Sequence, residues 1–282
     1  MRYIVVVLGV VLVSVFFKHY LSSVKPSPDV IRQIHYRFLV YNQTNSALHD
    51  ARVPLFAPVP SNAHQETISV EASRQFTIQD DEIGNREVVV TMLLPPRSTT
   101  ALSVTASVGL RRAPISEALV SGDIYLRNQP GIDVNHPEIK ALATNLKRNT
   151  TIETARSIYE WVHQNIRDTG FTKEDRGALF ALKEKQGDCT EFSNLFVALA
   201  RANGVPSRPL AGFVVEQDSV LKPFNYHNWS EFYDGRYWRI VDANKGVFDS
   251  GYDRYVTFKI LGASSGSEGL GQNNAGILVE MD

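Results

Sequence analysis

The hydrophobic pattern of this chain changes after Arg111, and the change limits the possible folds more than any other feature. From Ile31 to Arg111, apolar and polar residues alternate in runs separated by turn residues, a pattern typical of strands with one buried face. Between residues 136 and 202, apolar residues recur at helical spacing in several runs. The pattern therefore predicts an α+β chain in which a small antiparallel β-sandwich precedes a helix-containing domain.

Four alternating runs predict the strands of the sandwich, which we place at residues 28–112. They are IHYRFLVYN, TISVEASRQFTIQ, REVVVTMLL and ALSVTASVGL. The pair Gly84-Asn85 predicts a hairpin tip. Single histidines are scattered through the region at His35, His49 and His64, and we expect ordinary sheet or loop positions for them. The sandwich is thus expected to serve structure or recognition.

Helical signals follow a region without strong period at residues 113–135, which we interpret as a linker. HPEIKALATNLKR predicts a helix with Pro137 in its first turn. Thr150 and Glu153 form the pattern of a capping box and predict the start of a second helix. GALFALKEKQ predicts a short third helix.

The N-terminus carries an apolar run from Tyr3 to Phe17. It has the length of a signal-peptide core, and Tyr20 to Val24 extend it toward the roughly 20 apolar residues of a membrane-spanning helix. No A-x-A-like cleavage site follows. We therefore interpret residues 1–27 as a signal anchor or transmembrane segment, with a cleaved signal and a buried first helix as alternatives. Export of the remaining chain is expected.

Charge and cysteine content narrow the classes of function. The formal net charge is -1, so there is no bulk electrostatic reason to expect nucleic acid as a partner. Because Cys189 is the only cysteine, an intramolecular disulfide and a multi-cysteine metal site are excluded. No second histidine stands near His227 in the sequence, and we expect neither metal nor cofactor.

Cys189 is predicted to open a helix, because apolar residues recur at helical spacing from Thr190 to Ala202 and Asn203-Gly204 provides a stop. Unpaired backbone N–H groups and the positive end of the helix dipole favour a thiolate there. Asp188 is a candidate N-cap whose charge would partly oppose the thiolate. The position favours a nucleophile over a small buried hydrophobe.

A hairpin is predicted in YHNWSEFYDGRYWRIVDAN, with its turn at Asp234-Gly235. His227 lies near the start of its first strand and Asp242 at the end of its second. Because neighbouring strands lie about 4.8 Å apart, the two side chains can meet. A nucleophile needs a base, and the base needs an orienting partner, so Cys189, His227 and Asp242 are candidates for these roles.

Several residues near these candidates have a structural interpretation. We expect Trp229 and Trp238 to be core aromatics. Arg208 is expected to hold the fold by hydrogen bonds to nearby carbonyl groups, and Glu231 is an equally good candidate for the partner of such a cation. Tyr226 stays unassigned, with shielding of the site as one role.

Four motifs in this order resemble those of the transglutaminase-like superfamily. They are Gly187-Asp188-Cys189, Gly204-Val205-Pro206-Ser207-Arg208, His227-Asn228-Trp229-Ser230-Glu231 and Trp238-Arg239-Ile240-Val241-Asp242. The resemblance covers residues 135–245. It implies a papain-like core with helices packed on an antiparallel sheet, in a catalytic domain at residues 136–262. Residues 263–282 are then a C-terminal tail, and its closing ILVEM is a candidate edge strand.

The resemblance also implies the roles of the site residues. Cys189 corresponds to the nucleophile, His227 to the general base and then acid, and Asp242 to the residue that orients the imidazole. The backbone N–H of Cys189 is expected to donate to the oxyanion, with Gln186 as candidate helper. The chain departs from the animal enzymes at Asp188 and from many relatives at Ala243, which replaces a proline.

These expectations combine into a bacterial-type, membrane-anchored enzyme on the extracytoplasmic, periplasmic side, or a secreted one if the signal is cleaved. It would attack amide bonds of a protein or peptide substrate through a thioester, as a cysteine protease, amidase or acyltransferase. Water is favoured as acceptor because it is abundant outside the cell. The alternative is a non-catalytic scaffold with the transglutaminase fold at the membrane. Replacing Cys189 with alanine separates the two hypotheses.

Overall fold

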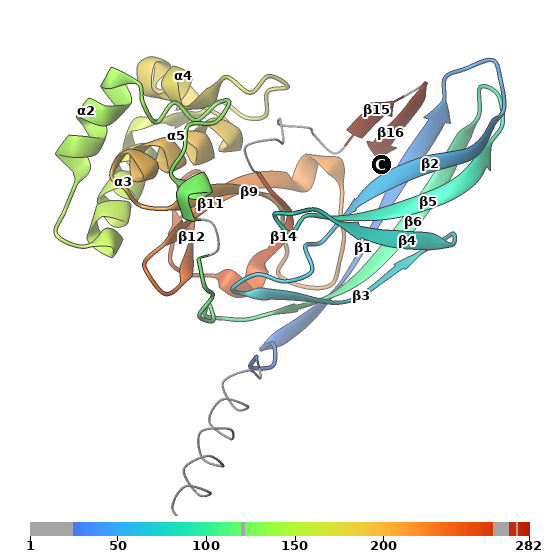
Figure 1. Ribbon diagram of the computed structural model, residues 1–282, viewed down its shortest axis with the longest axis horizontal. Coiled ribbons are helices and arrows are strands. Elements are labelled where there is room, and N and C mark those ends of the chain that lie inside the picture. The colour runs from blue at the N-terminus through green and yellow to red at the C-terminus, as the bar shows by residue number, and fades with distance from the viewer. Residues whose placement is uncertain (1–24, 120–121, 262–270, 275) are drawn as a thin grey trace, which may run out of the picture.

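Helices and long strands occupy different parts of the molecule. The computed structural model describes residues 25–119, 122–261, 271–274 and 276–282. The helices gather at one end, and the long strands of the first half of the chain extend from the other (Figure 1). This arrangement confirms the α+β class. The apolar run at Tyr3 to Phe17 lies outside the described residues, among which no helix has the length and apolar character to span a membrane.

The elements of the described chain follow the predicted change from strands to mixed structure. The strands are β1 (Val30–Asn42), β2 (Leu48–Ala57), β3 (Gln65–Ala72), β4 (Phe76–Asp80), β5 (Arg86–Leu94), β6 (Thr99–Leu110), β7 (Arg167–Asp168), β8 (Gln186–Gly187), β9 (Ser207–Val214), β10 (Ser219–Val220), β11 (Tyr226–Tyr233), β12 (Trp238–Asp242), β13 (Val247–Phe248), β14 (Tyr255–Ile260), β15 (Gly271–Asn274) and β16 (Ile277–Met281). The helices are α2 (Pro137–Leu146), α3 (Thr151–Asn165), α4 (Gly177–Glu184) and α5 (Cys189–Ala202), with short turns η1 (Gly122–Tyr125), η2 (Pro223–Asn225) and η3 (Tyr252–Arg254).

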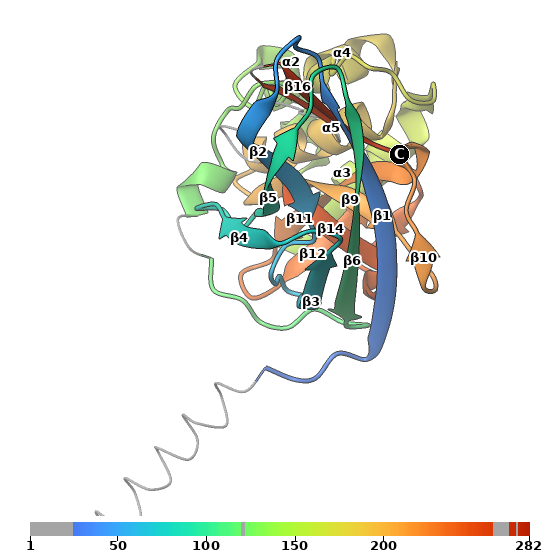
Figure 2. The ribbon, with the colours of Figure 1, turned by 90° about the vertical axis from the view of Figure 1, so that its right-hand side faces the viewer.

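The first half of the chain forms two facing sheets. One has the order β15-β16-β1-β6-β3, with β10 beside β1 (Figure 2), and the other has the order β2-β5-β4. Alternate side chains of β1 are buried, among them Ile34, Phe38 and Val40, as the period of two requires. They join β2 and β5 in one core, where each fully buried large apolar side chain contributes about 1.5–3 kcal/mol.

Among the strands predicted for residues 28–112, the hairpin tip was predicted correctly and one predicted strand was wrong. β4 and β5 pair around the predicted tip, and Gly84 has φ +93°, a backbone conformation that glycine adopts without strain. The run TISVEASRQFTIQ is not one strand, because the chain turns after Ala72 and sends β3 and β4 to different sheets. β2 was not predicted, since Pro54 interrupts its pattern.

The end of the chain completes the sheet that contains β1. The predicted strand at ILVEM exists as β16, which pairs with β1 on one side and β15 on the other. It is therefore an interior strand, because β15 covers its outer side. The backbone N–H of Asp282 also donates to the carbonyl of Arg37 over 2.9 Å.

The predicted helices are confirmed, and α5 is the central one. Thr150 and Glu153 form the predicted capping box at the start of α3, and Pro137 lies in the first turn of α2. α5 contacts α2, α3, α4 and the strands β9 and β11. Most of its side chains are buried, including Phe196, which is fully buried.

A third sheet, antiparallel and of order β13-β12-β11-β9-β14, supports α5. The predicted hairpin is present, with Tyr233 of β11 opposite Trp238 of β12. Phe232 of β11 packs against Phe196 of α5, with ring centroids 6.4 Å apart. This contact fixes one face of β11 against the helix that begins at Cys189.

The first residue of β3 and the loop before it contact the outer edge of this third sheet. Gln65 accepts from the backbone N–H of Thr257 over 2.7 Å and donates to its carbonyl over 3.1 Å. Asn62 donates to the hydroxyl of Thr257 over 3.1 Å. Edge strands leave backbone groups unpaired. Gln65 pairs the backbone N–H and carbonyl of Thr257 in β14, and so joins the sandwich to the third sheet.

Candidate active site

Cys189 is the first residue of α5, as predicted, and its side chain is half-buried. Asp188 caps the helix by accepting from the backbone N–H of Thr190 over 2.8 Å. Glu191 completes a capping box by accepting from the N–H of Asp188 over 2.9 Å. The other carboxylate oxygen of Asp188 accepts from the N–H of Thr172 over 2.9 Å, so backbone donors occupy both oxygens of this anion.

The turn before Cys189 requires glycine. A Cβ added at Gly187 would lie 2.4 Å from the Cβ of Glu191, closer than two carbon atoms can approach. Glu191 is fully buried and forms an ion pair with Arg176 at 2.7 Å, so it cannot move aside cheaply. The Gly-x-Cys pattern thus allows the capping glutamate to pack directly beneath the chain.

His227 and Asp242 meet as predicted, but along a diagonal. Nε2 of His227 lies 2.7 Å from Oδ2 of Asp242. Ser230 is opposite Val241 in the hairpin. In this register Asp242 lies opposite residue 229, and His227 is two residues before residue 229 on the same strand. Diagonal neighbours of this kind lie within reach of long side chains. Both residues are buried, so the pair is shielded from water.

The structure also brings Cys189 to the imidazole. Burial by itself lowers the pKa of His227, but hydrogen bonds and negative charge from Asp242 and Cys189 outweigh it and raise the pKa to about 9. Because Nε2 is committed to Asp242, Nδ1 is the ring nitrogen left for the sulfur. A ring protonated at neutral pH thus lies between a carboxylate and a thiol.

Asp242 has two further partners that sequence reasoning missed. The hydroxyl of Tyr255 donates to Oδ2 over 2.9 Å, and the backbone N–H of Lys245 donates to Oδ1 over 3.0 Å. Tyr255 comes from β14, at the far edge of the sheet. No sequence pattern linked it to Asp242, because only the strand order brings the two residues together.

The other residues discussed from the sequence lie in different parts of the fold. Trp229 and Trp238 are buried core residues as predicted. Gln186 accepts from Arg167 over 2.5 Å in the parallel pair β7–β8, and its role as an oxyanion helper stays a prediction. Burial raises the pKa of the Tyr226 phenol, and the charge of Cys189 adds to the rise, which places Tyr226 beside the sulfur.

Arg208 and Glu231 form a buried ion pair with an N–O distance of 2.8 Å. The partner of Arg208 is therefore the carboxylate of Glu231, one of the two kinds of partner expected from the sequence, and not a set of carbonyl groups. Its guanidinium also lies 4.1 Å from the centre of the Trp238 ring. Nδ1 of His64 in the sandwich lies 3.5 Å from the other oxygen of Glu231. Burial lowers the pKa of His64 to about 3, so the ring is neutral and this contact is not an ion pair.

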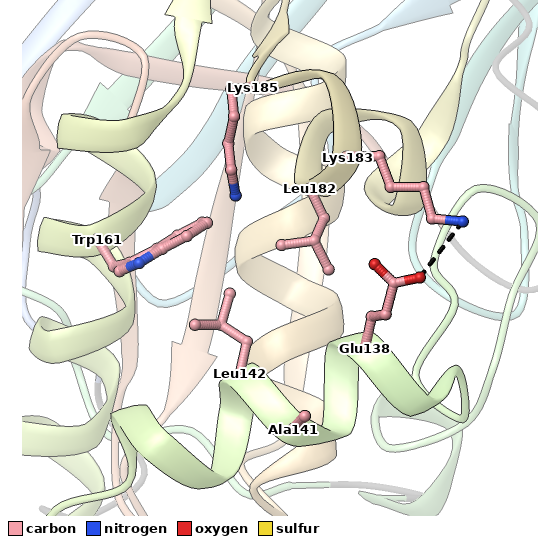
Figure 3. A pocket seen from close by; sticks show the side chains of 7 residues that line it. All are labelled: Glu138, Ala141, Leu142, Trp161, Leu182, Lys183 and Lys185. Carbon is pink, nitrogen blue, oxygen red and sulfur yellow. Dashed lines mark ion pairs between the residues drawn. The ribbon is translucent and has the colours of Figure 1, made fainter.

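A groove of about 560 Å³ lies elsewhere, between α2, α3 and α4 (Figure 3). Leu142, Leu182 and Trp161 line it, and the ammonium of Lys185 lies 4.3 Å from the centre of the Trp161 ring. Its lining contains none of the candidate catalytic residues. Among the described residues, no three His, Cys, Asp or Glu side chains gather as a set of metal ligands.

Comparison with known families decides what kind of domain contains this site. The family model of the transglutaminase-like superfamily matches residues 140–243. This part of the chain is a transglutaminase-like domain. It contains Cys189, His227 and Asp242, and the resemblance seen in the four sequence motifs is confirmed.

One solved structure shares the fold of this chain, and two others are similar to it with lower TM-scores. A proposed cysteine protease from Cytophaga hutchinsonii has a TM-score of 0.58 and 17% identity, with 90% of this chain and 100% of that chain covered. The periplasmic domain of TgpA from Pseudomonas aeruginosa has a TM-score of 0.41 and 16% identity, with 75% and 88% covered. Red sea bream transglutaminase has a TM-score of 0.29 and 14% identity, with 78% and 48% covered. No curated protein matches the sequence.

Proposed function

We propose that this chain is a cysteine-dependent acyl-transfer enzyme that attacks amide bonds of protein or peptide substrates. One observation carries the proposal: His227 is fixed to Asp242 through Nε2 at 2.7 Å, while the same ring contacts the thiol of Cys189 at a helix start. A nucleophile, a base and an orienting carboxylate in contact are the requirements for covalent catalysis.

The first half-reaction forms a thioester. The sulfur of Cys189 attacks the carbonyl carbon as a thiolate, with the protonated ring of His227 beside it, and the electron pair of the C=O bond moves to oxygen. The backbone N–H of Cys189 stabilises that oxyanion, because it is among the helix donors without an intrahelical partner. When the oxyanion collapses, the C–N bond breaks and His227 gives its proton to the leaving nitrogen.

The second half-reaction releases the acyl group. His227, now neutral, takes a proton from the acceptor as the acceptor attacks the thioester. The C–S bond then breaks and the thiolate returns opposite a protonated ring. We propose water as the main acceptor, which makes the reaction hydrolysis, and an amine in its place would make it transfer. Asp242 keeps the imidazole in one orientation through both steps.

The N-terminal segment leads to a proposal for location. We propose that residues 1–27 hold the enzyme at the membrane with the transglutaminase-like domain on the extracytoplasmic side, because the apolar run from Tyr3 to Phe17 has signal-anchor character. Fractionation of cells that express the full-length chain tests this. Recovery in the membrane fraction, with the domain open to protease from outside, is the expected result, and a cytoplasmic location would contradict it.

A trapping experiment tests the chemistry. The full-length chain is incubated with a peptide library, acid-quenched and analysed by mass spectrometry, which detects thioesters and cleaved amides. Because the chain has one cysteine, any thiol adduct must be at Cys189. We expect hydrolysed amides and an acyl adduct that Cys189→Ala abolishes. Unchanged biological activity of a stable Cys189→Ala variant would favour a scaffold, and absence of adduct and turnover with active thiol would overturn the proposal.

A further inference from the structure

Side-chain hydrogen bonds join α5, which begins at Cys189, to β11, which carries His227. Thr190 follows the cysteine and Asn228 follows the histidine. Nδ2 of Asn228 donates to the hydroxyl of Thr190 over 3.0 Å. The residues next to the proposed nucleophile and base are therefore bonded directly to each other.

A second contact lies one helical turn further along. The hydroxyl of Ser193 donates to the carbonyl of Trp229 over 2.7 Å and lies 2.9 Å from the hydroxyl of Ser230. Ser193 therefore contacts Trp229 and Ser230, the two residues that follow Asn228 in β11. The helix start and the strand start are thus connected in a fixed register.

Stability does not explain the Asn228 contact. Oδ1 of Asn228 is buried and has no hydrogen-bond partner in the described part of the chain. A hydrogen bond adds little net stability, and a buried acceptor left unpaired costs at least as much. The side-chain amide of Asn228 therefore adds little net stability to the fold.

The hydrogen bond between Asn228 and Thr190 lies next to Cys189, where other packing constraints are weak. Cys189 is the first residue of its helix and half-buried, so core packing holds it less firmly than the later residues of α5. The apolar contact of Phe196 with Phe232 lies two turns away and is non-directional. A hydrogen bond has a preferred length and angle, and the one at Thr190 acts a single residue from the sulfur.

We propose that Thr190 and Asn228 are positioning residues whose hydrogen bond sets the distance and direction between the sulfur of Cys189 and the ring of His227. This inference rests on the proposed acyl-transfer function. Neither side chain needs to touch substrate. Loss of the bond lets the helix start shift against β11, which weakens the contact between thiolate and imidazolium without unfolding the domain.

The test replaces both partners of the hydrogen bond with apolar residues in the full-length chain. Thr190→Val with Asn228→Leu removes both partners together, a change that is nearly neutral for stability when the shapes are kept. We expect an unchanged or higher denaturation midpoint, a kcat lower by about tenfold to a hundredfold and little change in KM. Thr190→Ser keeps the hydroxyl and should retain activity. Thr144→Val is the control, because the hydroxyl of Thr144 donates to the carbonyl of Lys140 on the exposed face of α2.

Alkylation of Cys189 by iodoacetamide gives a readout that needs no substrate. As the chain has one cysteine, the rate reports this sulfur alone. In the double variant we expect slower alkylation at neutral pH and a pH profile closer to that of an isolated thiol. If the double variant is stable and its alkylation rate has the same pH profile as that of the wild type, the inference is overturned, even where the variant's amide turnover is reduced. If that variant does not fold, the comparison of Thr190→Val with Thr190→Ser decides by the same criterion. An altered profile with no amide turnover in the wild type would instead contradict only the proposed function.

Discussion

The hydroxyl of Tyr255 and the imidazole of His227 meet on the same oxygen of Asp242. Nε2 of His227 lies 2.7 Å from Oδ2 and the tyrosine hydroxyl 2.9 Å from it. The carboxylate that orients the ring is thus itself held by a side chain from the opposite edge of the sheet. Support of an orienting group by a further hydrogen bond limits its rotation.

Tyr255→Phe should destabilise the domain and slow the enzyme. It removes a donor to a buried carboxylate, a type of bond worth about 1.5–3 kcal/mol, and it frees the carboxylate to rotate away from His227. Denaturant titration and kcat measure the two effects. Tyr36→Phe is the matched control, since its buried hydroxyl has no partner in the described structure, so its loss should leave stability equal or higher. Equal effects of the two changes would contradict the assignment.

Asp242→Asn should abolish most activity while the fold persists. An asparagine retains the shape but presents no charge and favours the wrong tautomer, a change that costs about four orders of magnitude in kcat in serine enzymes with this arrangement. Because Asp242 raises the pKa of His227, the variant should titrate well below about 9. NMR titration of the ring protons measures this, and an unmoved pKa would show that Asp242 does not control the ring.

Activity should depend on the proton of His227 at high pH. The ring has a pKa of about 9, and in its neutral form it cannot give a proton to the leaving nitrogen. We therefore expect kcat/KM for amide substrates to fall as the pH rises through about 9. Rates measured with an activated ester, which needs no proton at its leaving group, should fall less. Parallel profiles for the two substrates would contradict the general-acid role.

The same proton links stability to pH. The folded pKa of about 9 is above the ordinary value of 6.5, so the protonated ring binds its partners and stabilises the fold. This contribution is fully present below about pH 6.5 and is lost as the pH rises through about 9. The difference in Tm between wild type and His227→Asn should accordingly shrink across that window. A difference that grows with pH would reverse the assigned sign.

Arg208→Ala should be among the more destabilising changes in the domain. It leaves Glu231 fully buried without its cationic partner, and breaking a buried pair in this way costs about 3–5 kcal/mol. Arg127→Ala is the comparison, because its ion pair with Asp123 is exposed and should contribute about 0–1 kcal/mol. Urea denaturation of both variants measures the contrast, and a loss for Arg208→Ala no larger than for Arg127→Ala would rule out a structural role for the buried pair.

The features that the sequence determined by itself are those that depend on interactions between residues close in the chain. The capping box of Thr150 and Glu153, the helix start at Cys189 and the hairpin between His227 and Asp242 involve residues close in the chain. Their spacing satisfies helix ends and strand turns without knowledge of the rest of the fold. The candidate catalytic residues were found for this reason, aided by four motifs that resemble the family.

Tertiary structure decided the features that depend on which strands and helices become neighbours. Tyr255 reaches Asp242 because β14 pairs with β9, and Asn228 reaches Thr190 because α5 lies across β11. β3 and β4 enter different sheets although the run TISVEASRQFTIQ, which spans most of both, was predicted as one strand. Alternation specifies which face of a strand is buried, but the choice of partner strand depends on long-range packing, which no local pattern contains.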